Sequence, residues 1–221
     1  MSKKSEEKVV LQVVKELGLI GGVVIIYGAS GVGKTTLTIE LLRVLQAPKL
    51  YVASEPNIFY GERFKLVSQY AQTEFIKELP EAFRRAISFI QKNEGAFIAI
   101  DSVSAYAQHE AAKRMAIEGE LPQPLTIVGP LSFAANAMAQ AMAEYAIRQS
   151  ATVWLIAQER PAIGRTWRGE DAAPSFALRA LHSVLAVARL IYTNQGRFLR
   201  VVMHRDHRYE RKQAEVPEIK L

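Results

Sequence analysis

The chain has 221 residues, 49% hydrophobic and 23% charged, which is typical of a soluble globular protein and long enough for one α/β domain with short appendages. It contains no Cys, which excludes disulfides, thiolate catalysis and Cys-ligated zinc, and its four His residues form no HExxH motif. The net charge is +6, and five of the six excess positive charges lie in residues 111–221, which suits a polyanionic partner such as nucleic acid as well as a merely basic protein.

The first hundred residues alternate between helical and strand patterns. Apolar residues from Val9 to Leu17 recur at helical spacing, and short apolar runs between turn residues are typical of buried strands. These patterns predict helices over Glu6–Leu17, Thr36–Gln46, Tyr60–Gln72 and Pro80–Asn93. They predict strands over Val23–Tyr27, Lys49–Ser54 and Ala96–Asp101.

The second half continues the alternation with longer irregular stretches. Gly and Pro residues predict that part of Ser102–Gly129 is irregular, and an Ala- and Met-rich helix is predicted over Leu131–Gln149. A buried strand over Thr152–Gln158 leads into a loop rich in Gly, Pro and Arg over Glu159–Ser175. VLAVARLIYT, a Gln-Gly turn and RFLRVVMHR predict a terminal hairpin, and EVPEIKL predicts an edge strand.

This order of elements predicts the fold class. Strands that alternate with helices indicate an α/β fold with a mostly parallel central sheet, helices on both faces and a C-terminal antiparallel hairpin. We expect one core domain over residues 20–221, preceded by an N-terminal helix or extension over residues 1–19.

The segment Gly28-Ala29-Ser30-Gly31-Val32-Gly33-Lys34-Thr35 matches the P-loop pattern GxxxxGK[ST] without a mismatch. A predicted buried strand precedes it and a helix follows, which is the context that the motif requires. Its glycines let backbone N–H groups point at phosphates, and the helix N-terminus adds a positive dipole end. Lys34 would reach the β and γ phosphates, and Thr35 would bind Mg²⁺ through its hydroxyl.

Three more polar residues end predicted strands. Asp101 ends AFIAID, the Walker B position that holds Mg²⁺ in P-loop enzymes. Glu55 could polarise the water that attacks the γ phosphate, and the Gln158 amide could bind that phosphate and report its loss to the adjoining loop. The structural alternatives are that Asp101 caps a helix or turn, that Glu55 forms a salt bridge, and that Gln158 forms hydrogen bonds with the loop backbone.

Taken in order, the P-loop unit, YVASEPNIFYGERF, AFIAIDS and WLIAQ resemble the RecA/RadA recombinase ATPase core over roughly residues 20–221. RFLRVVMHRDHRYE looks like the end of the short archaeal paralogues called RadB. The resemblance implies a RecA-like P-loop ATPase with ATP and Mg²⁺ as cofactors, in which Glu55 is the catalytic carboxylate, Asp101 the Walker B acid and Gln158 the sensor. It implies that ATP and Mg²⁺ bind Gly28, Ala29, Ser30, Gly31, Val32, Gly33, Lys34, Thr35 and Thr36.

The resemblance also places two DNA-facing loops, at Ser102–Gly129 and Glu159–Ser175. The second loop contains Arg160, Arg165, Trp167 and Arg168, and Arg side chains around an aromatic ring can pair with phosphates and stack a base. A Trp that packs on a neighbouring surface is an equally open interpretation. A second basic cluster comprises Arg197, Arg200, Arg205, Arg208, Arg211 and Lys212. Strand alternation would place some of these on one face as a further DNA contact, but a solvated hairpin is the favoured interpretation.

These observations predict an ATP-binding, slowly ATP-hydrolysing recombinase paralogue that binds DNA, single-stranded DNA above all, and modulates homologous recombination and DNA repair. The expected activity is a Mg²⁺-dependent ATPase stimulated by DNA. A full-length recombinase, a nuclease or a second copy of the chain are the expected protein partners, in the cytoplasm and without a membrane partner. The alternatives are a P-loop small-molecule kinase, and an ATP-dependent, KaiC-like scaffold or regulatory partner without DNA binding.

Overall fold

The computed structural model describes residues 3–55, 62–118, 137–162, 166–175 and 183–217. Its strands are β1 (Gly22–Gly28), β2 (Lys49–Ala53), β3 (Gln72–Phe75), β4 (Phe97–Asp101), β5 (Thr152–Pro161), β6 (Ala172–Pro174), β7 (Ala186–Thr193), β8 (Gly196–His204) and β9 (Gln213–Glu215). They form one sheet in the order β3-β2-β4-β5-β1-β7-β8-β9, and β6 pairs with β5. The sheet is parallel from β3 to β7, while β8 and β9 are antiparallel. The predicted α/β class is confirmed.

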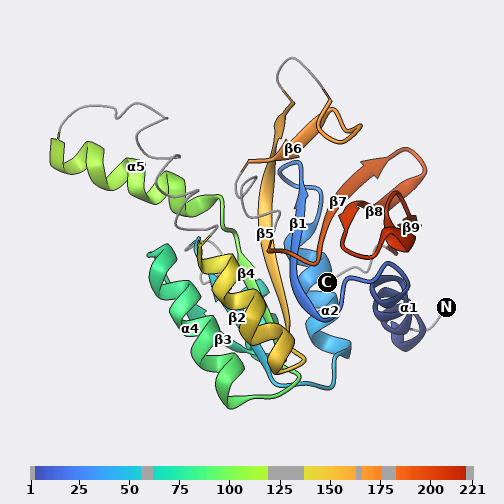
Figure 1. Ribbon diagram of the computed structural model, residues 1–221, viewed down its shortest axis with the longest axis horizontal. Helices are drawn as coiled ribbons and strands as arrows, with labels where there is room; N and C mark the ends of the chain where they lie inside the picture. Colours follow the sequence, from blue (N-terminus) through green and yellow to red (C-terminus); the bar gives the residue numbers. More distant parts are fainter. Residues whose placement is uncertain (1–2, 56–61, 119–136, 163–165, 176–182, 218–221) are drawn as a thin grey trace.

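Helices cover both faces of the sheet (Figure 1). The helices are α1 (Lys3–Glu16), α2 (Lys34–Val44), α3 (Glu62–Ser68), α4 (Leu79–Lys92), α5 (Ala105–Glu118) and residues 137–148, and a short 3-10 turn, η3, covers His207–Tyr209. Apolar side chains of α1 and α2 pack on one face of β1, and those of α4 and residues 137–148 belong to the core on the other face. Among the described residues, no helix combines the length and apolar character needed to cross a bilayer.

The central position of β1 follows from its composition. All seven of its residues are buried, because the run VVIIY lies between β5 and β7 and carries helices on both faces. Trp154 on β5 is fully buried, and its indole N–H donates to the Leu19 carbonyl oxygen at 3.1 Å, which ties the segment before β1 to the neighbouring strand. The strand that leads into the P-loop is therefore held from both sides.

Several predicted elements need correction. The helix predicted to reach Gln72 ends at Ser68, and β3 follows it as an unpredicted edge strand. The stretch predicted to be partly irregular begins with α5, which extends away from the sheet (Figure 1), and residues 119–129 lie outside the described ranges. The first six residues of the predicted helix over 131–149 also lie outside them.

The prediction of a loop over Glu159–Ser175 is also partly wrong, because strands extend into both ends of that segment. β5 continues to Pro161, and Glu159 to Pro161 pair with β6. The last strand covers Gln213–Glu215, so it starts two residues before the predicted segment EVPEIKL and shares only Glu215 with it; residues 218–221 are not among those described. The arms of the predicted loop are thus fixed by backbone hydrogen bonds.

Candidate nucleotide site

The P-loop leaves β1 at Gly28 and enters α2 at Lys34. Gly31 and Gly33 have φ angles of 78° and 92°, in the left-handed region that favours glycine. Glycine is needed at position 28 for a steric reason and not for its φ angle, since a Cβ there would lie 2.4 Å from the carbonyl oxygen of Leu190 on β7. The motif therefore folds as predicted from its residue types.

Lys34 lies across the P-loop with only 6% of its surface exposed. Its Nζ donates to the carbonyl oxygens of Gly28 at 2.9 Å and Ala29 at 2.7 Å, and to Gln158 Oε1 at 3.1 Å. Burial lowers the pKa of Lys34, although nearby carboxylates, Asp101 first among them, oppose that effect. The predicted sensor and the P-loop lysine are thus in direct contact.

Thr35 and Asp101 form the predicted metal pair. Thr35 Oγ1 donates to Asp101 Oδ2 at 2.6 Å, and the Tyr51 hydroxyl donates to the same oxygen at 2.8 Å. Burial raises the pKa of Asp101, and these two hydrogen bonds partly offset the rise. A hydroxyl and a carboxylate side by side are hard oxygen donors of the kind that Mg²⁺ takes beside phosphates, so the residues fit that ion.

Glu55 follows β2 and faces the same edge of the sheet. Ser102, the residue after β4, donates from its hydroxyl to Glu55 Oε1 at 3.1 Å. The Ser54 hydroxyl donates to the Ser102 carbonyl oxygen and accepts from the Ser102 N–H, both at 2.8 Å. His109 Nε2 lies 2.6 Å from the Ser54 carbonyl oxygen, which makes that nitrogen the donor. The carboxylate is therefore held in place by residues of two neighbouring strand ends.

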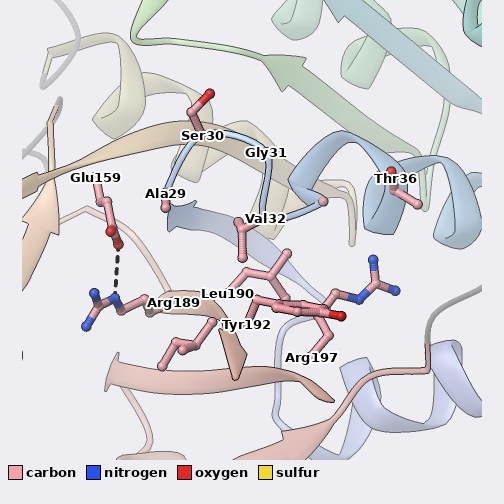
Figure 2. Close-up of a pocket in the computed structure, with 12 residues that line it drawn as sticks. Ala29, Ser30, Gly31, Val32, Thr36, Glu159, Arg189, Leu190, Tyr192 and Arg197 are labelled. Atoms are coloured by element: carbon pink, nitrogen blue, oxygen red, sulfur yellow. Dashed lines mark hydrogen bonds and ion pairs between the residues drawn. The ribbon is translucent and has the colours of Figure 1, made fainter. Parts of the chain in front are cut away.

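Two cavities flank the P-loop. One, of about 730 Å³, is lined by Glu55, Ser102 and Gln158 among others and lies on the side of the predicted catalytic groups. The other, of about 710 Å³, lies between the loop and the end of β7, with Tyr192 and Arg197 in its wall (Figure 2). Together they leave space for a ligand on both sides of the P-loop.

Arg189 of β7 lies where the two cavities meet, opposite Tyr27 in the register of β1 and β7. Its guanidinium pairs with Glu159 at 3.1 Å, with Glu170 at 2.8 Å and with Asp171 (Figure 2 shows the first of these). These three acids lie on the arms and tip of the predicted DNA-facing loop. Arg189 therefore fastens that loop to the strand beside the P-loop.

The described part of that loop places its predicted DNA-binding residues differently. Arg160 and Arg168 are exposed, whereas Trp167 is half-buried and meets the Tyr27 ring edge-on at 5.9 Å. Arg165 lies outside the described residues. Of the two interpretations of Trp167, this geometry favours packing on the neighbouring surface.

Arg197 is a residue of the site that the sequence interpretation missed. The interpretation that we favoured for its basic cluster, a solvated hairpin, is wrong for Arg197, because this residue is only 3% exposed and pairs with the fully buried Glu40 of α2 at 2.8 Å. Strand alternation alone cannot show such a pair. The available signal was Glu40 itself, an acid in the apolar run TLTIELL, which needs a cationic partner if it is buried.

The comparisons with known proteins identify the fold. No protein-family model matches the chain, and no curated protein matches it. It is similar to the crystal structure of the RadB recombinase, with a TM-score of 0.60 and 18% identity over 91% of this chain and 90% of that one. It is also similar to an ATPase from the type III secretion system of pathogenic bacteria, with a TM-score of 0.50 and 17% identity over 80% of this chain and 53% of that one. The RecA-like ATPase fold implied by the sequence resemblance is confirmed.

Proposed function

We propose that this chain, a RecA-like ATPase by fold, is a Mg²⁺-dependent, slowly hydrolysing ATPase of the recombinase-paralogue type that binds DNA and modulates homologous recombination. One observation carries the proposal: Lys34, the Thr35–Asp101 pair, Glu55 and Gln158 converge at one edge of the sheet around the P-loop. Each of these groups has a part in phosphoryl transfer, where catalysis is mainly positioning and electrostatic stabilisation.

In the proposed mechanism Lys34 exchanges its carbonyl partners for the β and γ phosphate oxygens of ATP. Thr35 and Asp101, already 2.6 Å apart, would hold Mg²⁺, which neutralises phosphate charge when bound. Glu55 accepts a hydrogen bond from the attacking water and aims its lone pair at the γ phosphorus. Ser102 keeps the Glu55 carboxylate oriented through its 3.1 Å hydrogen bond.

Gln158 connects the site to the loop that follows β5. Its amide oxygen accepts from Lys34, its backbone N–H donates to Ser104 Oγ at 2.9 Å, and its carbonyl oxygen accepts from the Ser175 N–H at 2.7 Å. A γ phosphate that takes Lys34 away from Gln158 changes the hydrogen bonding of a residue tied to both arms of the loop. This contact offers a route by which ATP and a ligand of the loop influence each other.

Support for DNA as that ligand comes from charge. The chain carries a net charge of +6, and Arg160 and Arg168 are exposed on the loop. The fold's likeness to RadB, which is a recombinase, supports the same ligand. We propose single-stranded DNA as the ligand, held through its phosphates and therefore most tightly at low salt.

The test is ATP turnover with and without single-stranded DNA over a salt series. We expect Glu55→Gln to lower kcat at least about a hundredfold while leaving ATP binding intact, because only the base is lost. Glu78→Gln is the matched control, since the Glu78 side chain is 61% exposed and, among the described residues, its carboxylate pairs only with Lys113 at the surface. The proposal fails if Glu55→Gln hydrolyses ATP at the wild-type rate, or if DNA at low salt neither binds nor changes turnover.

A further inference from the structure

Arg197 is a buried residue in the wall of the cavity beside the P-loop. It lies near the start of β8 with 3% of its side chain exposed, and its Nη2 donates to Glu40 Oε2 at 2.8 Å and to the Pro217 carbonyl oxygen. Its Nε has no hydrogen-bond partner among the described residues although it is buried. A buried, unpaired N–H is costly, so its presence in a folded protein requires a structural or functional reason.

The guanidinium approaches the P-loop closely. A Cβ at Gly33 would lie 3.0 Å from Arg197 Nη1, so the guanidinium lies directly against the backbone of position 33. Figure 2 shows the side chain running along the wall of the 710 Å³ cavity toward the first turn of α2, which carries Thr36. The Nη1 end of the guanidinium thus lies beside the P-loop backbone at Gly33.

Its place along the loop indicates which phosphate it would meet. Lys34 Nζ contacts Gln158, which lines the same cavity as Glu55, and the proposed function puts the β and γ phosphates on this side. Arg197 lines the other cavity, of about 710 Å³, near Gly33 and Thr36. A triphosphate that occupies the P-loop from the Lys34 side would bring its α phosphate to the Arg197 side.

We infer that Arg197 binds the α phosphate of the nucleotide from within the same chain, with Glu40 holding the guanidinium in place. This inference rests on the proposed function. An α-phosphate contact exists equally with ATP and ADP and in the ground and transition states. It therefore adds uniform binding, which changes KM and leaves kcat alone.

The test compares Arg197→Lys with wild type in titrations with ATP, ADP, 2′-deoxy-ATP and 3′-deoxy-ATP, together with ATP turnover. Lysine keeps the charge that Glu40 requires, so we expect the variant to fold, which thermal unfolding checks. We expect the affinities for all four nucleotides to fall by the same factor, about tenfold, which is the order expected for one charge-assisted hydrogen bond. KM should rise and kcat should stay within about twofold.

Arg200→Lys is the matched control, because Arg200 lies on the same strand and is 41% exposed. It should bind all four nucleotides as wild type does. Wild-type affinity of Arg197→Lys for ATP and ADP would overturn the inference and leave the proposed function standing. A loss confined to ATP would assign Arg197 to the γ phosphate, and a loss that vanishes with a deoxynucleotide would assign it to the ribose; either overturns the inference. A wild-type chain that binds no nucleotide overturns the proposed function and this inference together.

Discussion

Replacing Gly28 by Ala tests how closely β7 holds the start of the P-loop. The added Cβ would lie 2.4 Å from the Leu190 carbonyl oxygen and 3.0 Å from Val32 Cγ1. A carbon–oxygen contact normally needs about 3.3 Å, so the loop and β7 must separate by about 0.9 Å. The Leu190 oxygen belongs to the backbone of a strand paired on both sides and cannot swing away as a side chain would.

Overpacking of this kind costs about 1–3 kcal/mol, and the lower entropy of Ala in the unfolded chain returns up to about 1 kcal/mol. We therefore expect Gly28→Ala to lower the free energy of unfolding in urea by up to about 3 kcal/mol and to weaken ATP binding. The control is Gly95→Ala, where φ is +68° and no described atom lies within 4 Å of the added carbon. It should cost about 1 kcal/mol and leave ATP binding unchanged. A Gly28→Ala protein with wild-type stability and ATP affinity would refute the argument.

Three further substitutions test other contacts, each by urea unfolding. Trp154→Phe should cost about 2–4 kcal/mol, because it leaves the Leu19 carbonyl oxygen unpaired and opens space in the core; a loss below about 1 kcal/mol would contradict this. Arg189→Met should cost about 1–3 kcal/mol and speed proteolysis of the loop after β5, since Glu159 and Asp171 lose the cation they pair with and Glu170 keeps only its contact with Arg200 among the described residues. Trp167→Ala should cost about 1–3 kcal/mol through its contact with Tyr27, whereas unchanged stability with weaker DNA binding would favour base stacking instead.

Buried strands were the easiest part of the fold to predict. Runs such as AFIAID and TVWLIAQ are continuous and apolar, and the structure pairs both in the parallel centre of the sheet. β3 has the sequence QTEF and lies at the sheet edge, where one side needs no apolar neighbour, so its residues carry little signal. The start of α5 was hidden for a different reason, because the Gly and Pro residues beyond Glu118 dominated the pattern of that stretch.

The candidate site likewise contains some residues that local sequence patterns predict and others that they do not. Lys34, Thr35 and Asp101 stand at fixed offsets from glycines or strand ends, so sequence order alone brings them together. Arg197 and Glu40 are 157 positions apart and meet only because β8 returns beside α2. Long-range pairs of this kind depend on the completed topology, which local patterns do not contain.

The position of β1 in the sheet affects how the chain folds during its synthesis. Its partners are β5 and β7, which begin at Thr152 and Ala186. At ribosomal rates of roughly 5–20 residues per second, the newly made β1 waits about 6–25 seconds for its first neighbour. During that interval the apolar, unpaired strand can bind chaperones or aggregate. The P-loop cannot reach its folded position between β5 and β7 before most of the chain has been translated.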